Sequence, residues 1–142
     1  MRFNELYNQK ILEVVSKNRC DLSNFSLQRI DNNIYNFTNL IELNLSENQI
    51  HNISSQIENL INLKTLNLSD NLIEELSSNI GNIVELENLF LSGNKLKELP
   101  QTIINLKKLK WLSLVDNREL LINEEQKSWI QELKKSGCKI LL

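Results

Sequence analysis

The chain has 142 residues, 41% of them hydrophobic, which is enough to bury the core of one domain of ordinary size. With 16 basic and 18 acidic residues its formal net charge is −2, so no overall positive field would attract nucleic acid or an anionic membrane. No run of 18 apolar residues and no signal peptide is visible, and we expect no membrane insertion.

Residues 3–17 are predicted to form an N-terminal helix. Apolar residues recur there at helical spacing and form one stripe, with charged residues elsewhere. The stripe consists of Phe3, Leu6, Tyr7, Ile11, Val14 and Val15. We interpret this helix as a lid over the open end of whatever core follows, in preference to a partner-binding helix.

The middle of the chain repeats one short sequence motif at a fixed spacing. Residues 63–73 read LKTLNLSDNLI, residues 40–50 read LIELNLSENQI, and residues 86–96 read LENLFLSGNKL. Residues 109–117 read LKWLSLVDN, so the four units start 23 residues apart. Such self-similarity predicts stacked units, none of which can bury its apolar face alone.

Each unit combines a short strand, a turn and a returning segment. Leu66, Asn67 and Leu68 alternate apolar and polar, which is typical of a strand with one buried face. The turn carries an Asn whose amide can bond backbone groups with both ends, and we predict a column of Asn48, Asn71, Asn94 and Asn117. In the second half apolar residues lie three and four apart, which favours a helical or 3₁₀ turn packed on the strand.

This 23-residue spelling, with apolar places 1, 4 and 6 and Asn at place 9, resembles the leucine-rich repeat family, as found in small bacterial or intracellular proteins. The resemblance implies an α/β fold: a right-handed solenoid with a concave parallel β-sheet and a helical or 3₁₀ convex side. We expect a single domain over residues 1–142. It has an N-terminal capping helix (1–17), five repeats starting near 17, 40, 63, 86 and 109 within residues 17–120, and a C-terminal cap (121–142).

The first repeat and the convex turns depart from the pattern. Lys17 stands where the other repeats start with Leu, and Phe25 replaces the turn Asn, as a capping repeat allows. Pro100 occupies a convex place at which other repeats carry Asp31, Ser54 and Ser77, and we expect looser convex turns in those three repeats.

The C-terminal cap is predicted as a helix followed by a strand. Asn123 and Gln126 have the spacing of a capping box, so a helix should run over residues 124–135 and bury Trp129, Ile130 and Leu133. Gly137 is placed to end it, and residues 138–142 read as a last edge strand.

Catalytic, cofactor and metal sites find little support. His51 is the only histidine and falls in a turn, where we expect it to be exposed. Glu47, Asp70 and Asp116 lie on one rim, which favours a solvated edge over a cation site. Cys20 and Cys138 should lie about 20 Å or more apart at opposite ends, which excludes a disulfide between them. We therefore predict a protein that is not an enzyme and needs no cofactor or metal.

The remaining candidate for a functional site is the outer surface of the predicted sheet. Strand places 3, 5 and 7 should point away from the core and line up across the concave sheet. The first repeats present small and polar groups there, whereas the last two present aromatic and apolar ones. The predicted partner-binding residues are Phe90, Trp111, Val115, Asn88, Ser113, Asn67, Asn44 and Glu42.

The resemblance implies a non-catalytic module that binds another protein on this face, and exposed grouped aromatics are typical of binding hot spots. Two alternatives stay open: a weakly self-associating structural module, and the recognition fragment of a larger enzyme or effector. Unpaired thiols suit a reducing compartment, which favours the cytoplasm, although secretion without a signal peptide is left open.

Overall fold

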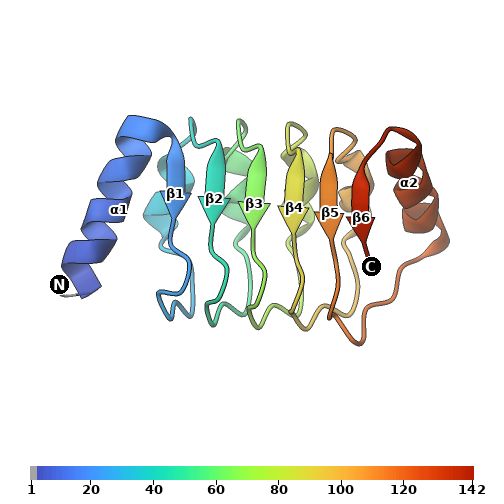
Figure 1. Cartoon of the computed structure of the whole chain (residues 1–142), viewed down its shortest axis with the longest axis horizontal. Helices are drawn as coiled ribbons and strands as arrows, with labels where there is room; N and C mark the ends of the chain where they lie inside the picture. Colours follow the sequence, from blue (N-terminus) through green and yellow to red (C-terminus); the bar gives the residue numbers. More distant parts are fainter. Residues whose placement is uncertain (1–2) are drawn as a thin grey trace.

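The fold is a stack of short coils closed by a helix at each end (Figure 1). The computed structural model describes residues 3–142, and the side chain of Phe3 lies outside the described part. The N-terminal helix α1 spans Phe3–Lys17 and the C-terminal helix α2 spans Glu124–Lys135, which are the bounds that the sequence predicts. Neither they nor any other helix among residues 3–142 is long and apolar enough to cross a membrane.

Six strands form one parallel sheet in chain order, β1 to β6. Each strand has three residues, and neighbours pair so that partners in β1 to β5 lie 23 residues apart, as Leu43 pairs with Leu66. The strands are β1 (Arg19–Asp21), β2 (Glu42–Asn44), β3 (Thr65–Asn67), β4 (Asn88–Phe90), β5 (Trp111–Ser113) and β6 (Lys139–Leu141). Because of this fixed register, side chains at equivalent positions of successive repeats form columns across the sheet.

Short 3₁₀ helices return the chain along the opposite side of the stack: η1 (Asn32–Asn36), η2 (Ser55–Asn59), η3 (Ser78–Asn82) and η4 (Gln101–Asn105). All four have five residues. The side chains of Asp31, Ser54 and Ser77 each accept a hydrogen bond from the backbone N–H two residues on, whereas Pro100 makes none. Looser turns in the three repeats without proline are therefore a wrong prediction, because a capping side chain holds the same backbone there.

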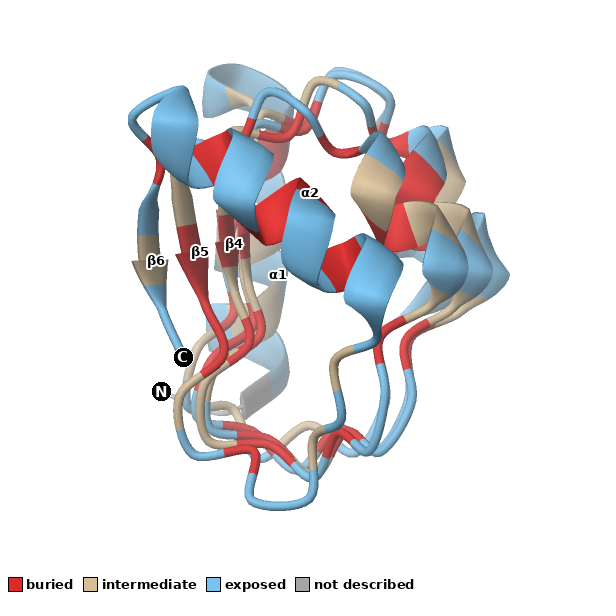
Figure 2. Cartoon of the chain, turned by 90° about the vertical axis from the view of Figure 1, so that its right-hand side faces the viewer, coloured by how far each residue is buried: buried red, intermediate tan, exposed pale blue. Residues whose placement is uncertain are grey.

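The core lies between the sheet and the 3₁₀ helices, in one cluster that runs the length of the stack (Figure 2). Leu66 and Leu68 are fully buried, while Asn67 between them is half-buried, as the alternation predicts. Gly81 in η3 lies close against the next coil, because a Cβ there would collide with the backbone oxygen of Thr102.

The predicted asparagine column is present and buried. The Asn71 amide donates to the carbonyl oxygens of Leu45 (2.9 Å) and Leu68 (3.1 Å), and its oxygen accepts from the Ile50 N–H (3.0 Å). Asn48, Asn94 and Asn117 repeat this arrangement. The column therefore ties each turn to the preceding coil.

Helix α1 covers the first coil with a narrower stripe than the sequence predicts. Val14 is buried and Tyr7 and Ile11 are half-buried, but Leu6 is 37% and Val15 70% exposed. The prediction is wrong for Val15, because the helix rests on the coil edge along one line only. Tyr7 packs edge-on against Phe25, with ring centroids 6.3 Å apart.

Helix α2 and strand β6 close the other end. Asn123 and Gln126 form the predicted capping box, and Trp129, Ile130 and Leu133 are buried. Gln126 also donates to the Leu99 carbonyl at 2.9 Å, which ties the helix to the last complete coil. The same end leaves β6 as the edge strand of the sheet (Figure 1).

Candidate interaction surface on the sheet

The outer face of the sheet is hollowed between α1 and β4. The hollow has a volume of about 430 Å³. Charged residues line it near α1, among them Glu13, Arg19 and Glu42, and Asn44 and Asn67 line its middle. Phe90 closes it toward the C-terminal strands, so the hollow leads from a charged end to an aromatic one.

The strand register brings the predicted site residues together. Glu42 and Asn44 lie on β2, Asn67 on β3, Asn88 and Phe90 on β4, and Trp111 and Ser113 on β5, while Val115 follows β5. Asn44 is the register partner of Asn67, Asn88 that of Trp111, and Phe90 that of Ser113. Ser113 is only 6% exposed and has its hydroxyl bonded to that of Ser92, so it can offer little surface to a partner.

Phe90 and Trp111 form one aromatic pair. Their ring centroids are 5.4 Å apart at an interplanar angle of 67°, an edge-to-face contact. Both side chains are half-buried, which corrects the expectation that they stand largely exposed. Each ring covers part of the other, and the Lys139 ammonium lies 4.2 Å from the centre of the Trp111 ring.

The polar half of the sheet uses its side chains partly for its own structure. The Asn44 oxygen accepts from the N–H and the hydroxyl of Ser46, and the Asn67 oxygen accepts from the Ser69 N–H. These bonds hold the chain where it leaves each strand. The amide nitrogens of Asn44 and Asn67 make no hydrogen bond within residues 3–142, so two donors on neighbouring strands remain for a ligand.

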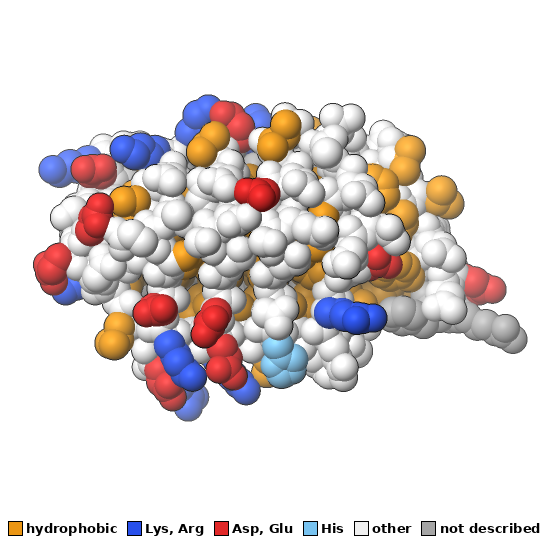
Figure 3. Space-filling model, turned by 180° about the vertical axis from the view of Figure 1, so that it is seen from behind, with side chains coloured by type: hydrophobic (Ala, Val, Ile, Leu, Met, Phe, Trp, Pro, Cys, Tyr) orange, Lys and Arg blue, Asp and Glu red, His pale blue; other side chains and the backbone are white. Residues whose placement is uncertain are grey.

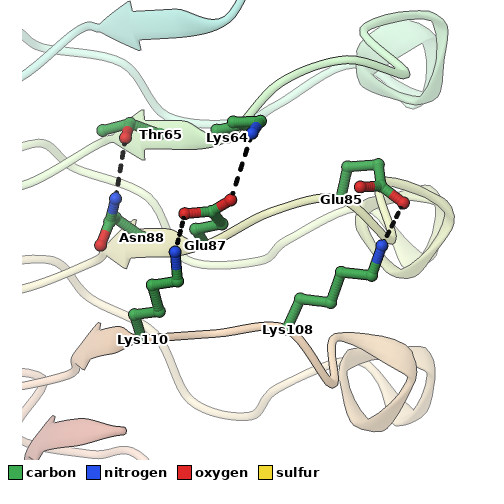
Figure 4. A network of polar contacts seen from close by, with 7 residues as sticks. All are labelled: Lys64, Thr65, Glu85, Glu87, Asn88, Lys108 and Lys110. Carbon is green, nitrogen blue, oxygen red and sulfur yellow. Dashed lines mark hydrogen bonds and ion pairs between the residues drawn. The ribbon is translucent and has the colours of Figure 1, made fainter.

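A row of ion pairs borders the surface where the chain enters β3 to β5 (Figure 4). Glu87 binds Lys64 at 3.3 Å and Lys110 at 2.6 Å, so one carboxylate joins three successive coils. The hydrogen bond from Lys110 and that from Lys64 hold the pKa of Glu87 below its ordinary value. Exposed pairs of this kind add little stability, but they keep the border of the aromatic pair polar.

His51, the two cysteines and the acidic residues are the candidates for chemistry in this chain. His51 is exposed, and nowhere in residues 3–142 do three His, Cys, Asp or Glu side chains gather to hold a metal ion. Cys20 and Cys138 are free and buried, and burial raises the pKa of Cys20 to about 12, which suits an unreactive thiol.

The rim carboxylates have a backbone feature that the sequence analysis missed. Glu47, Asp70 and Asp116 have φ of 55°, 55° and 60°, and Gly93 at the same place has 65°. Asn24 at the same place of the first repeat has φ of 57°. This place therefore has a left-handed backbone in every repeat, which glycine, asparagine and aspartate tolerate and which glutamate disfavours. The available signal was the combination of Asn24, Asp70, Gly93 and Asp116 at equivalent places.

Lys139 is the other residue that sequence reasoning missed. It pairs with Trp111 in the register of β5 and β6. The prediction of a last edge strand over residues 138–142 already implied a neighbour for β5. It gave no register, because the strand lies outside the 23-residue repeat.

Comparisons with known proteins agree with this architecture. The family described as "Leucine-rich repeat region" matches residues 16–135. A leucine-rich repeat protein of Leptospira interrogans superposes with a TM-score of 0.68 at 32% identity, covering 81% of this chain and 28% of that one. None of the curated proteins searched matches the chain.

Two further structures extend the range of relatives. An internalin of Listeria monocytogenes superposes with a TM-score of 0.60 at 26% identity, over 76% of this chain and 29% of that one. A chain of the Toll–Spatzle complex of Drosophila gives 0.62 at 26% identity, over 70% and 14%. The present chain thus spans less than a third of each of these three proteins. Leucine-rich repeat domains are typically protein-interaction modules and usually non-catalytic. On the match to residues 16–135, the chain belongs to the leucine-rich repeat family.

Proposed function

We propose that this domain binds a protein partner on the outer face of its sheet, with Phe90, Trp111 and Val115 as the apolar anchor. The observation that carries the proposal is the half-buried aromatic pair at one end of an otherwise polar face. Asn88, Asn67, Asn44 and Glu42 continue the contact across β4, β3 and β2.

Three physical features support this surface. The aromatic rings are held against each other on neighbouring strands, so little side-chain entropy is lost when a partner covers them. They are surrounded by polar and charged groups, as hot spots commonly are. The unused amide nitrogens of Asn44 and Asn67 add hydrogen-bond donors beside the apolar anchor.

The face of the molecule opposite the sheet has fewer features of a binding site. Uncharged polar side chains and backbone cover most of it, and apolar side chains are scattered between them (Figure 3). Several polar side chains there bond to the neighbouring coil, as the Asn62 amide does to the Thr38 carbonyl at 2.9 Å. These bonds serve the stacking of the coils. Ile61 and Val84, which follow η2 and η3, are 58% and 48% exposed, but they are aliphatic and lack the rings of the pair on the sheet.

The test uses a partner captured with the wild-type domain and measures its affinity for the Phe90→Ala, Trp111→Ala double variant. We expect binding to weaken at least about tenfold, or roughly 1.4 kcal/mol. The matched control is Glu42→Ala with Thr65→Ala on the polar half, which should matter less. Circular dichroism and urea titration establish that both variants are folded. Undiminished binding by the aromatic variant would reject the proposed face.

A second candidate is self-association through the edge strand. Leu141 and Leu142 are 40% and 62% exposed beside the open edge of β6. Exposed apolar edges favour pairing between chains. Light scattering across concentration tests this: a mass that rises with concentration supports it, and a constant monomer mass rejects it. A third reading makes the domain the recognition part of a larger enzyme or effector, which the short coverage of its relatives leaves open.

A further inference from the structure

Trp111 carries an unsatisfied donor. Among the described residues, its indole Nε1 is the only buried side-chain nitrogen or oxygen without a hydrogen-bond partner. The other tryptophan behaves differently, because Trp129 donates to the Leu106 carbonyl at 3.1 Å. A buried donor without an acceptor is unfavourable. A hydrogen bond from the Trp111 indole to an oxygen of a ligand would therefore stabilise binding more than a hydrogen bond from a donor that is already solvated.

Lys139 places a positive charge at the same ring. Its ammonium lies 4.2 Å from the ring centre, and none of the ion pairs in residues 3–142 includes it. Glu87 at the border of the sheet is bound to two other lysines, Lys64 and Lys110. The aromatic end of the surface therefore combines a cation that has no carboxylate partner among these ion pairs with an N–H donor that has no acceptor.

The other end of the surface carries charges of both signs, with Lys17 and Arg19 beside carboxylates. Asp21 and Glu42 lie on β1 and β2, and Arg19 pairs with Glu42 at 3.3 Å. Asp21 would repel a negatively charged ligand at that end, and Lys17 and Arg19 offset this repulsion only in part. Lys139 on β6 attracts such a ligand, which favours placing its negative group at the aromatic end.

From these contacts we propose that the partner presents a carboxylate next to a large apolar side chain. This inference rests on the proposed function of the same face. The carboxylate oxygens accept from Lys139 and from the Trp111 indole, and the apolar group packs on Phe90 and Val115. Because the indole N–H is buried in the free protein, the side chains around it must shift, or the ring must turn, when the carboxylate arrives.

The smallest probe with this chemistry is N-acetyl-phenylalanine, and N-acetyl-phenylalanine amide is its neutral match. Both are titrated into ¹⁵N-labelled protein while the two tryptophan indole signals are followed, with Trp129 as the internal control and Trp129→Phe for assignment. We expect the acid to bind with millimolar affinity and to shift the Trp111 indole proton downfield, as a new hydrogen bond does. The amide should bind about tenfold more weakly.

Lys139→Met keeps the apolar stem and removes the charge, and Lys135→Met on α2 is the control for net charge. The first should weaken binding of the acid about tenfold and the second should not change it. Equal binding of acid and amide, no shift of the Trp111 signal, or no effect of Lys139→Met would each overturn the inference. If a captured partner then still depended on Phe90 and Trp111 but not on Lys139, the proposed function would stand and the carboxylate would be wrong.

Discussion

Replacing Asn71 by alanine tests the asparagine column, and the bonds show what would be lost. The Asn71 amide donates to the carbonyls of Leu45 and Leu68, but each of these also accepts from a neighbouring column member. Only the Ile50 N–H, which donates to the Asn71 oxygen, would be left without a partner. A single buried donor without an acceptor costs about 1 to 3 kcal/mol, and this is the expected loss in the free energy of unfolding.

Asn117→Ala should lower the free energy of unfolding more than Asn71→Ala does, because Asn117 is the last member of the column. The substitution would leave both the Leu96 N–H and the Leu114 carbonyl without their bonds, since no further member supplies a second donor to Leu114. Urea titration monitored by circular dichroism measures both variants, with an unchanged m-value as evidence of two-state unfolding. A neutral Asn71→Ala would refute the role of the column. A smaller loss for Asn117→Ala than for Asn71→Ala would refute the shared-acceptor reasoning.

Three further predictions concern the coils. Leu66→Ala should lower the free energy of unfolding by about 2 to 5 kcal/mol and Asn67→Ala by far less, and equal melting temperatures would contradict the assignment of buried and outward sides. Gly81→Ala should cost about 1 to 3 kcal/mol because its Cβ would collide with the backbone of the next coil, whereas Glu58→Ala at the equivalent place should be nearly neutral in the same urea titration. Glu87→Gln should lower the free energy of unfolding at pH values above 4.5, the ordinary pKa of glutamate. Because the pKa of Glu87 is lower in the folded protein, the difference in free energy of unfolding between variant and wild type should vanish as the pH falls through that folded pKa. A difference that persists at low pH would show that the charge of Glu87 is not responsible.

The repeated sequence motif predicted most of the fold because each of its positions has one structural role. Leu66 and Leu68 alternate with Asn67, so the buried side of the strand follows from period alone. Asn71 recurs every 23 residues, and a buried amide has few other uses at a turn. The capping box at Asn123 and Gln126 and the glycine at 137 are local signals, so short-range spacing determined both ends of α2.

What the sequence could not supply are contacts between segments that the repeat does not relate. Ser113 is buried, although its place in the strand predicts an outward side chain. Trp111 is half-buried because Phe90 and Lys139 cover it, and the register that brings Lys139 there is not encoded in the 23-residue period. Val15 lies on the predicted stripe of α1, but the docking angle of the helix leaves it exposed.

The left-handed turn is a third kind of omission. Glu47 adopts φ of 55°, which its residue type disfavours, and only the rest of the coil imposes that backbone. Asn24, Asp70, Gly93 and Asp116 at the equivalent places are residue types that tolerate this backbone, but the acidic members of the column suggested a rim of charges instead.

The binding face is tested most directly by a photoreactive phenylalanine analogue placed at Phe90, with the same analogue at Gln56 on the opposite face as the control. Irradiation in the presence of a captured partner should yield a covalent adduct from position 90 and little from position 56. The reverse pattern, with an adduct from Gln56 and none from Phe90, would contradict binding on the sheet face.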